Sequence, residues 1–209
     1  MIRIKNLTYN YDKRFSTLYE LNLNLQQNQK VILLNDTSLE TQTLFRLISK
    51  QDKIQKGEIF SNGKNINDIK RKDLSICYIT QTPFLLNKTV SKNLIYPLTI
   101  RGVNKKIAIK KAEEILETFN LTELKDKKPR HLSNFEKILV TLMRAMMREY
   151  EILLIDDIFN FNERENNKLI ELINKLMKNK TCLISFKDNK LINNFENIKI
   201  LELNYGKIK

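Results

Sequence analysis

The chain has 209 residues, long enough for one good-sized domain with an inserted lobe, and 42% of them are hydrophobic, enough for a packed core. A net charge of +13 comes from 37 Lys and Arg against 24 Asp and Glu, but the lysines are spread along the chain, which favours a compositional bias over a dedicated anion-binding patch. The two cysteines, Cys77 and Cys182, lie in apolar runs, which indicates buried thiols and argues against a disulfide or a metal pair.

The first part of the chain is predicted to form short strands joined by turns. Val31–Leu34 is apolar throughout, as in a strand covered on both faces, whereas Leu21–Leu25 alternates between apolar and polar residues. Asn62-Gly63 is the strongest hairpin signal in the chain. The predicted elements are strands at residues 1–11, 21–25, 31–34, 57–64 (with its turn) and 75–80, and a short helix at 43–50.

From Thr89 to Met147 the pattern becomes helical. Residues 138–147 are apolar nearly all round, which predicts a buried helix. An apolar stripe at helical spacing predicts an amphipathic helix before it, formed by Ala108, Ala112, Ile115, Leu116 and Phe119.

The last part of the chain returns to an α/β pattern. Residues 151–157 read as a buried strand that ends in two carboxylates, and residues 169–177 read as an amphipathic helix. A strand at 181–185 and a hairpin at 198–208 complete the chain. Together these elements predict an α/β core that is interrupted by a helical insert.

The sequence shows no amino-terminal charged-then-apolar signal and no apolar stretch near 18 residues. We therefore expect a cytoplasmic protein that reaches the inner face of the cell membrane only through a partner.

Six segments, in the same order and at similar spacing, resemble the ATP-binding subunit of ABC transporters over almost the whole chain: Thr43–Ile48, Gly57–Lys64, Tyr78–Gln81, Thr89–Gly102, Leu132-Ser133 and Ile152–Asp157. The segment Thr89–Gly102 is most similar to the lipoprotein-release, macrolide-export and cell-division branch. The resemblance implies a P-loop NTPase-like (RecA-like) α/β core with an antiparallel β subdomain and a helical insert. It implies one domain, with residues 1–82 and 150–209 as the core and 83–149 as the helical subdomain.

The phosphate loop of this family reads G-x-x-x-x-G-K-[ST], and the chain departs from it. Asn35 and Glu40 replace the two glycines, Thr41 replaces the lysine, and Gln42 replaces the magnesium-binding hydroxyl. Asn tolerates left-handed backbone, but Glu40 adds a negative charge, and Thr41 removes charge-assisted bonds worth roughly 1.5–3 kcal/mol each. By resemblance the nucleotide-binding positions are Tyr11, which would stack on adenine, and Asn35, Ser38, Glu40, Thr41, Gln42 and Thr43.

The signature segment of the family, L-S-G-G-Q, binds nucleotide held by the opposite subunit, and it is also altered here. Ser133 is kept, but Asn134 and Phe135 replace the glycines and Glu136 replaces the glutamine. Ser133 and Glu136 also have the spacing of a helix capping box, and we favour that structural role.

The catalytic positions are better preserved. By resemblance Asp156 would hold Mg²⁺, Asp157 falls where a glutamate polarises water, and Gln81 ends the strand before the insert. Two carboxylates at a strand end could equally face solvent. Phe186 replaces the switch histidine of the family, and the only histidine, His131, is expected at the surface.

Three hypotheses follow. The first is a degenerate pseudo-ATPase that acts beside a membrane permease, as a homodimer or a heterodimer with another ABC ATPase. The second is a divergent but active subunit that uses ATP and Mg²⁺. The third, ranked lower, is a nucleic-acid or membrane-surface binder, and we consider nucleic acid an unlikely partner. A groove beside Pro83–Leu98, lined by Phe84, Leu85 and Leu86, is the expected contact with the permease, although these residues could also pack between lobes.

Overall fold

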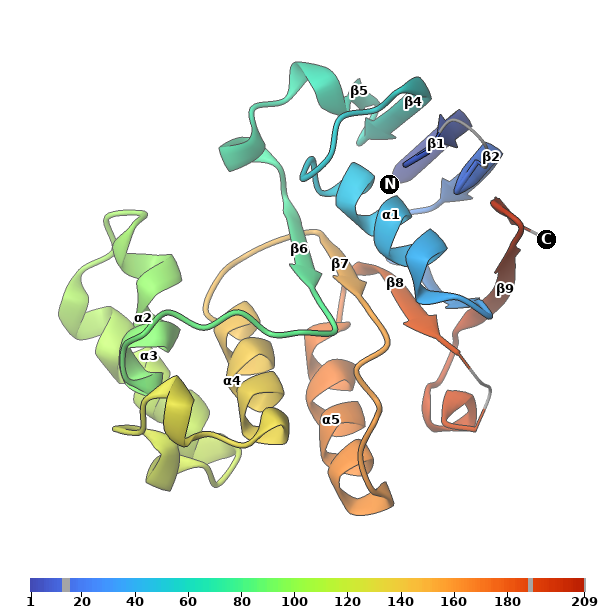
Figure 1. Ribbon diagram of the computed structural model, residues 1–209. Helices are drawn as coiled ribbons and strands as arrows, with labels where there is room; N and C mark the ends of the chain where they lie inside the picture. Colours follow the sequence, from blue (N-terminus) through green and yellow to red (C-terminus); the bar gives the residue numbers. More distant parts are fainter. Residues whose placement is uncertain (13–15, 188–189, 209) are drawn as a thin grey trace. The chain divides into compact units, whose positions relative to one another are not determined.

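The computed structural model describes residues 1–12, 16–187 and 190–208. The chain divides into two compact units (Figure 1). The first contains residues 1–81, 150–157 and 177–209, and the second contains residues 82–149 and 158–176.

An antiparallel sheet in the first unit has the strand order β2-β1-β4-β5. The Asn62-Gly63 hairpin is confirmed, because Ser61 pairs with Lys64 across it. Gly57 is required in this sheet, since a Cβ at its φ of +93° would lie 2.5 Å from the carbonyl oxygen of Asn6. The strands are β1 (Ile2–Tyr9), β2 (Leu18–Leu25), β4 (Lys56–Ser61) and β5 (Lys64–Asn65).

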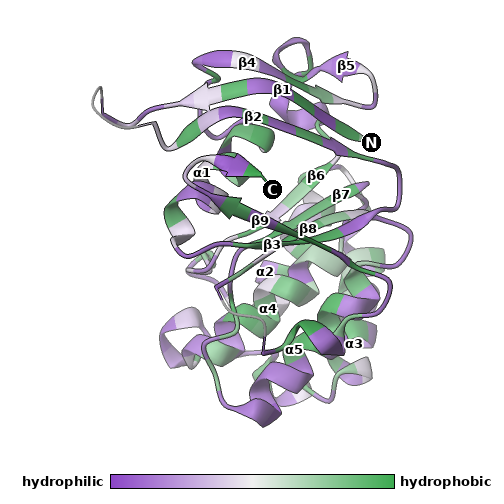
Figure 2. Ribbon diagram, turned by 90° about the vertical axis from the view of Figure 1, so that its right-hand side faces the viewer, coloured by the Kyte–Doolittle hydropathy of each residue, from purple (hydrophilic) through white to green (hydrophobic). Residues whose placement is uncertain are grey.

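A mainly parallel sheet of six strands has the order β10-β9-β3-β8-β7-β6. Every residue of β7 and β8 is buried, as the continuous apolar runs predicted, and both strands are mostly coloured hydrophobic in Figure 2. The strands are β3 (Lys30–Leu34), β6 (Ile76–Ile79), β7 (Ile152–Ile155), β8 (Thr181–Phe186), β9 (Lys199–Asn204) and β10 (Lys207–Ile208).

The parallel strands β3, β8, β7 and β6 end at one edge of this sheet, and their ends position the candidate site. Leu34 pairs with Phe186, and Ile79 pairs with Ile155. The residues that follow, Asn35 and Asp156, therefore leave the sheet at the same edge, where ligands bind in open α/β sheets.

The helix α1 (Ser38–Ile48) follows β3 and completes the first unit. Its buried Leu44, Phe45, Leu47 and Ile48 belong to one apolar cluster with residues of both sheets. The helix begins five residues before the predicted start at Thr43. The unit also contains the short 3₁₀ helices η1 (Ile66–Asp68), η2 (Arg71–Asp73) and η5 (Ile192–Asn194).

The second unit is helical, as predicted. Ala108, Ala112 and Leu116 are buried on one face of α3, and every residue from Ile138 to Met143 is buried in α4. The helices are α2 (Val90–Thr99), α3 (Lys105–Thr118), α4 (Asn134–Met146) and α5 (Glu163–Leu176), with short 3₁₀ helices η3 (Thr122–Leu124) and η4 (Pro129–His131).

The two units differ from the predicted division of the chain in one segment. Residues 158–176, which include α5, lie in the helical unit, whereas we assigned them to the core. The domain assignment itself stays a prediction. Both cysteines are free and buried, as expected. Among the described residues, no helix combines the length and the apolar character needed to cross a membrane.

Candidate functional site

The segment at the expected phosphate loop is short. The chain leaves β3 at Leu34 and enters α1 at Ser38, so only Asn35–Thr37 lie between them. Thr37, the N-cap, has extended backbone, and in the fully described segment Asn35–Thr43 no residue has a positive φ. The left-handed conformation that we allowed for Asn35 is therefore not used, and the residues Glu40 to Gln42 are helical.

Asn35, Thr41 and Ser185 form a buried polar cluster at the edge of the parallel sheet. Thr41 has no exposed surface, and its Oγ1 lies 3.1 Å from Ser185 Oγ and accepts a hydrogen bond from Asn35 Nδ2 at 3.1 Å. Asn35 Nδ2 also donates to the carbonyl of Thr37, and the Thr41 hydroxyl donates to the carbonyl of Ser38 at 3.2 Å. The position expected to carry a lysine is thus filled by a hydroxyl that bonds to the protein itself.

Glu40 binds the turn between β9 and β10. The backbone N–H of Gly206 donates to Glu40 Oε1 at 2.7 Å. Burial raises the pKa of Glu40, the Gly206 hydrogen bond opposes that rise, and Asp36 adds to it. A side chain at position 206 would not fit, because a Cβ there would lie 2.8 Å from the backbone nitrogen of Tyr19. The negative charge that we expected beside phosphates is therefore tied to the carboxy-terminal hairpin.

Tyr11 lies beside the second turn of α1. Thr43 Oγ1 is 3.4 Å from the Tyr11 hydroxyl and donates to the carbonyl of Leu39 at 2.6 Å. The Tyr11 ring is 53% exposed and meets Tyr9 edge-on at 5.0 Å. The resemblance implied that this ring stacks on adenine, and that role stays a prediction.

Asp156 is buried at the end of β7, and only one of its two carboxylate oxygens accepts hydrogen bonds from described residues. Oδ2 accepts from the Tyr78 hydroxyl at 2.7 Å and from the Gln81 amide at 3.4 Å, whereas Oδ1 is buried without a hydrogen-bond partner among the described residues. Burial raises the pKa of Asp156 to about 6, with a smaller rise from Asp157, against the two hydrogen bonds. Burial, with the adjacent carboxylate, also raises the pKa of Tyr78, which keeps this phenol a proton donor.

The signature segment of the second unit begins α4. Ser133 Oγ accepts from the Glu136 amide at 3.1 Å, and Glu136 Oε2 accepts from the Ser133 amide at 2.7 Å. The predicted capping box is therefore confirmed. Burial alone would raise the pKa of Glu136, but the Ser133 amide and Lys127, at 3.1 Å, hold it below its usual value. Asn134 is exposed at the first position of the helix.

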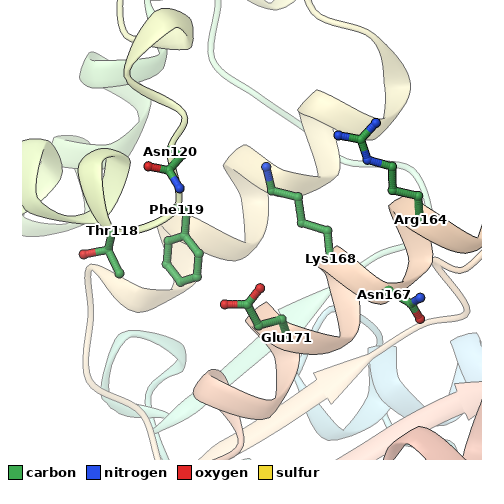
Figure 3. A pocket seen from close by; sticks show the side chains of 7 residues that line it. All are labelled: Thr118, Phe119, Asn120, Arg164, Asn167, Lys168 and Glu171. Carbon is green, nitrogen blue, oxygen red and sulfur yellow. The ribbon is translucent and has the colours of Figure 1, made fainter.

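Phe135, which stands where the family has its second signature glycine, packs inside the second unit. Its ring meets Phe161 edge-on at 5.4 Å and lines a hollow of about 300 Å³ together with Asn162, Arg164, Glu165 and Lys168. A neighbouring hollow of about 370 Å³ shares Arg164 and Lys168 and is lined also by Thr118, Phe119, Asn120, Asn167 and Glu171 (Figure 3). A bulky aromatic ring thus occupies the position where the resemblance implies a signature glycine.

The two remaining expectations concern Phe186 and His131. Phe186 is 2% exposed, and its ring meets Phe195 edge-on at 5.8 Å, so this position presents no acid or base. His131 is exposed, as expected, and accepts a hydrogen bond from Arg130 Nε at 3.0 Å.

Sequence reasoning missed two side chains of the site, Tyr78 and Ser185. Tyr78 lies three residues before Gln81 on β6, and this strand pairs in parallel with β7, which carries Asp156 at its end. Ser185 lies on β8 opposite Leu33 of β3. A polar residue within a buried strand end was the available signal in both cases.

Comparison with known proteins supports one family. The family model described as "ABC transporter" matches residues 18–160. The methionine import ATP-binding protein MetN of Legionella pneumophila (strain Lens) is 31% identical over 163 residues, which cover 75% of this chain and 48% of MetN. The oligosaccharides import ATP-binding protein MsmX of Bacillus subtilis is 26% identical over 157 residues, or 75% of this chain and 43% of MsmX. The chain therefore spans less than half the length of these relatives.

Solved structures show the same fold. A dimeric ABC transporter cassette, MJ0796, superposes with a TM-score of 0.87 at 23% identity and covers 100% of this chain and 97% of that chain. The cbiO1 protein of Clostridium perfringens, part of the cbiONQ complex, gives a TM-score of 0.83 at 20% identity, with 100% and 86% coverage. At these identities the likeness shows the fold alone, and it confirms the predicted P-loop NTPase-like architecture. With the family match over residues 18–160, the chain belongs to the ABC transporter family as an ATP-binding cassette domain.

Proposed function

We propose that this chain is an ABC transporter subunit that binds ATP weakly or not at all and has a structural or regulatory role beside a membrane permease. The observation that carries the proposal is Thr41. It has no exposed surface, and its hydroxyl contacts Asn35 and Ser185 at the position where the family has its phosphate-binding lysine.

Domains of this family generally bind ATP and Mg²⁺, but the residues present here do not fit that pair. Phosphate loops hold phosphate with a lysine and with backbone N–H groups that point inward from a glycine-rich loop. In this chain α1 begins at Ser38, and the carboxylate of Glu40 accepts a hydrogen bond from the Gly206 amide. The loop therefore lacks both the charge and the backbone conformation that hold phosphate.

The magnesium position is also compromised. Mg²⁺ prefers several hard oxygen ligands in octahedral geometry. The Oδ2 atom of Asp156 is bonded to Tyr78, and burial raises the pKa of this carboxyl to about 6, so proton and metal would compete for it around pH 6 and below. In the part of the chain that the structure describes, no cluster of three or more His, Cys, Asp or Glu side chains could hold a metal ion.

The distribution of the altered residues bears on the proposed partners. A dimer of this family forms each site from the phosphate loop of one subunit and the signature of the other. Here the loop carries Thr41 and the signature carries Phe135. A homodimer would have two impaired sites, and a heterodimer with an intact ABC ATPase would have one defect in each site. We therefore propose that the permease, rather than nucleotide, is the principal ligand.

The surface that we propose for the permease surrounds Phe84, which is 73% exposed, while Leu85 and Leu86 are half-buried. In that arrangement the chain sits at the cytoplasmic face of the membrane through its partner. Membership of the lipoprotein-release, macrolide-export and cell-division branch, suggested by Thr89–Gly102, is part of the same proposal.

Calorimetric titration with ATP and Mg²⁺ tests the proposal. An ABC cassette with an intact G-x-x-x-x-G-K-[ST] loop, titrated in parallel, provides the positive control. We expect saturable binding of the control and none of this chain in the micromolar range. A micromolar dissociation constant for this chain would overturn the proposal.

A divergent but active ATPase is the second candidate, and Asp156 favours it. Its Oδ1 atom is buried without a hydrogen bond among the described residues, and such an oxygen is open to a ligand. In this case purified protein with its permease should hydrolyse ATP, and Asp157→Asn should abolish the turnover. Turnover that is absent in the wild type, or unchanged in Asp157→Asn, counts against this candidate.

A further inference from the structure

The Lys and Arg residues are spread along the chain, as expected, but the acidic residues are not, so net positive charge is concentrated in one segment. From Leu74 to Ala112 the sequence contains seven Lys or Arg and no Asp or Glu. The exposed large hydrophobic side chains of the second unit lie in the same segment: Phe84, Tyr96, Ile100 and Ile107. Exposed apolar groups and charge of one sign thus coincide in sequence.

Three of these apolar side chains lie at one end of the α2–α3 hairpin. Tyr96 and Ile100 are one helical turn apart, because the Ile100 amide donates to the Tyr96 carbonyl at 3.1 Å. Ile100 is the C-cap of α2, and Ile107 is in the first turn of α3, which lies against α2 (Figure 1). We call Tyr96, Ile100, Ile107 and the adjacent Arg101, Lys105 and Lys106 the hairpin tip.

Exposure at the hairpin tip is high for side chains of this kind. Ile100 and Ile107 are each 61% exposed, and Tyr96 is 40% exposed. Single exposed hydrophobic residues are common on protein surfaces, but a group of them at one end of a hairpin marks an interaction site.

The cations of the hairpin tip have no carboxylate partners. Within the described ranges, Lys105 and Lys106 form no ion pair, and the guanidinium of Arg101 donates only to the carbonyl of Pro97, at 3.0 Å. Elsewhere in this unit lysines do find partners, such as Lys125 with Glu113 at 2.6 Å. The positive charge of the tip is therefore not neutralised by the protein.

We propose that the hairpin tip binds an anionic membrane surface directly. Aliphatic side chains and a tyrosine beside a cluster of lysines suit the interface of a bilayer, where the apolar groups enter the headgroup region and the cations meet lipid phosphates. Nucleic acid would satisfy the cations, but it would leave both isoleucines in water. This inference does not depend on whether the chain hydrolyses ATP.

Sedimentation of the full chain with phospholipid vesicles tests the proposal. We expect binding to vesicles that contain phosphatidylglycerol, weaker binding as salt increases, and none to pure phosphatidylcholine. Each lysine near an anionic surface strengthens binding by about fivefold, so the double variant Lys105→Gln/Lys106→Gln should bind the vesicles roughly tenfold or more weakly. Ile100→Ser/Ile107→Ser should also weaken binding, although the charge is unchanged.

Matched controls are available on the first unit. Lys56→Gln/Lys64→Gln removes the same charge from exposed positions, and Ile200→Ser alters an isoleucine that is 47% exposed. These variants should bind vesicles like the wild type. Equal losses in control and tip variants, binding to neutral vesicles, or no binding would each overturn the proposal. So would tight binding to a DNA duplex that the isoleucine substitutions leave unchanged, with no binding to vesicles.

Discussion

The hydroxyl of Thr41 lies 3.1 Å from the hydroxyl of Ser185, across 144 residues of sequence. Thr41 is in the first turn of α1, and Ser185 is near the end of β8. The contact therefore joins the helix to the edge of the parallel sheet at the expected phosphate position. In a nucleotide-binding loop the side chain at position 41 would extend toward a ligand. Here it satisfies its hydrogen bonds within the protein, which stabilises the fold without a ligand.

A double-mutant cycle should detect this contact. Thr41→Val and Ser185→Ala should each lower the free energy of unfolding by about 1–2 kcal/mol, because each leaves a buried polar partner unsatisfied. The double variant should lose less than the sum of the two, by about 0.5 kcal/mol or more. Denaturant unfolding measures all three. Thr37→Val is the control, because Thr37 is an exposed N-cap whose side chain makes no cap hydrogen bond. Strictly additive losses in the Thr41 and Ser185 variants would contradict the contact.

Asp156 predicts a pH dependence of stability. Its pKa rises from 3.8 to about 6 in the folded protein, mainly through burial. The folded state therefore holds the proton more tightly than the unfolded state, and the stability associated with this group falls as pH rises from about 4 to about 6. Asp156→Asn should therefore stabilise the protein by up to about 3 kcal/mol well above pH 6, and little near pH 4.

Denaturant unfolding at the two pH values measures this effect, and Asp36→Asn provides the control, because Asp36 is exposed. A difference between wild type and Asp156→Asn that does not change with pH would show that Asp156 titrates normally.

Asn93 is predicted to hold the segment that carries Phe84. Its side chain is buried, accepts from the Leu86 amide at 2.8 Å and donates to the carbonyls of Leu86, Lys88 and Thr89 at 3.0 Å. Asn93→Ala should lower the free energy of unfolding by about 2–3 kcal/mol, because it leaves the Leu86 amide and the three carbonyls without their hydrogen-bond partner. Hydrogen exchange of the Leu86 amide should then accelerate, whereas the exposed Asn87→Ala should leave it unchanged. Unaltered protection at Leu86 in Asn93→Ala would refute the role.

The strands and the signature cap could be predicted from the sequence because their causes are local. A continuous apolar run such as Val31–Leu34 needs cover on both faces, and Asn62-Gly63 specifies a tight hairpin. Ser133 and Glu136 satisfy the first amides of a helix from within four residues.

The sequence prediction starts α1 too late, at Thr43, because a phosphate loop is expected before the helix. Without glycines, the segment Ser38–Gln42 has no residue that requires a loop, and it continues the helix. The contacts Thr41–Ser185 and Tyr78–Asp156 join residues 144 and 78 positions apart, so they depend on the register of the parallel strands. Hydrophobic patterns along one strand do not determine its register against a distant partner.

The serine of the signature segment allows a structural role to be separated from a role toward nucleotide. Ser133→Ala should lower the free energy of unfolding by about 1 kcal/mol, because the amide of Glu136 loses its acceptor. Ser133→Asp supplies another acceptor and should restore the cap, and Glu136→Gln should keep its own half of the capping box. Asn134→Ala, at an exposed position whose side chain is outside the cap, is the matched control.

Denaturant unfolding ranks these variants, and permease binding should follow the same order if Ser133 acts only by stabilising α4. An aspartate in place of a serine that contacts phosphate would instead repel it. If the Ser133→Asp variant is stable but no longer assembles with the permease in the presence of ATP, Ser133 contacts nucleotide. That result would contradict the purely structural role.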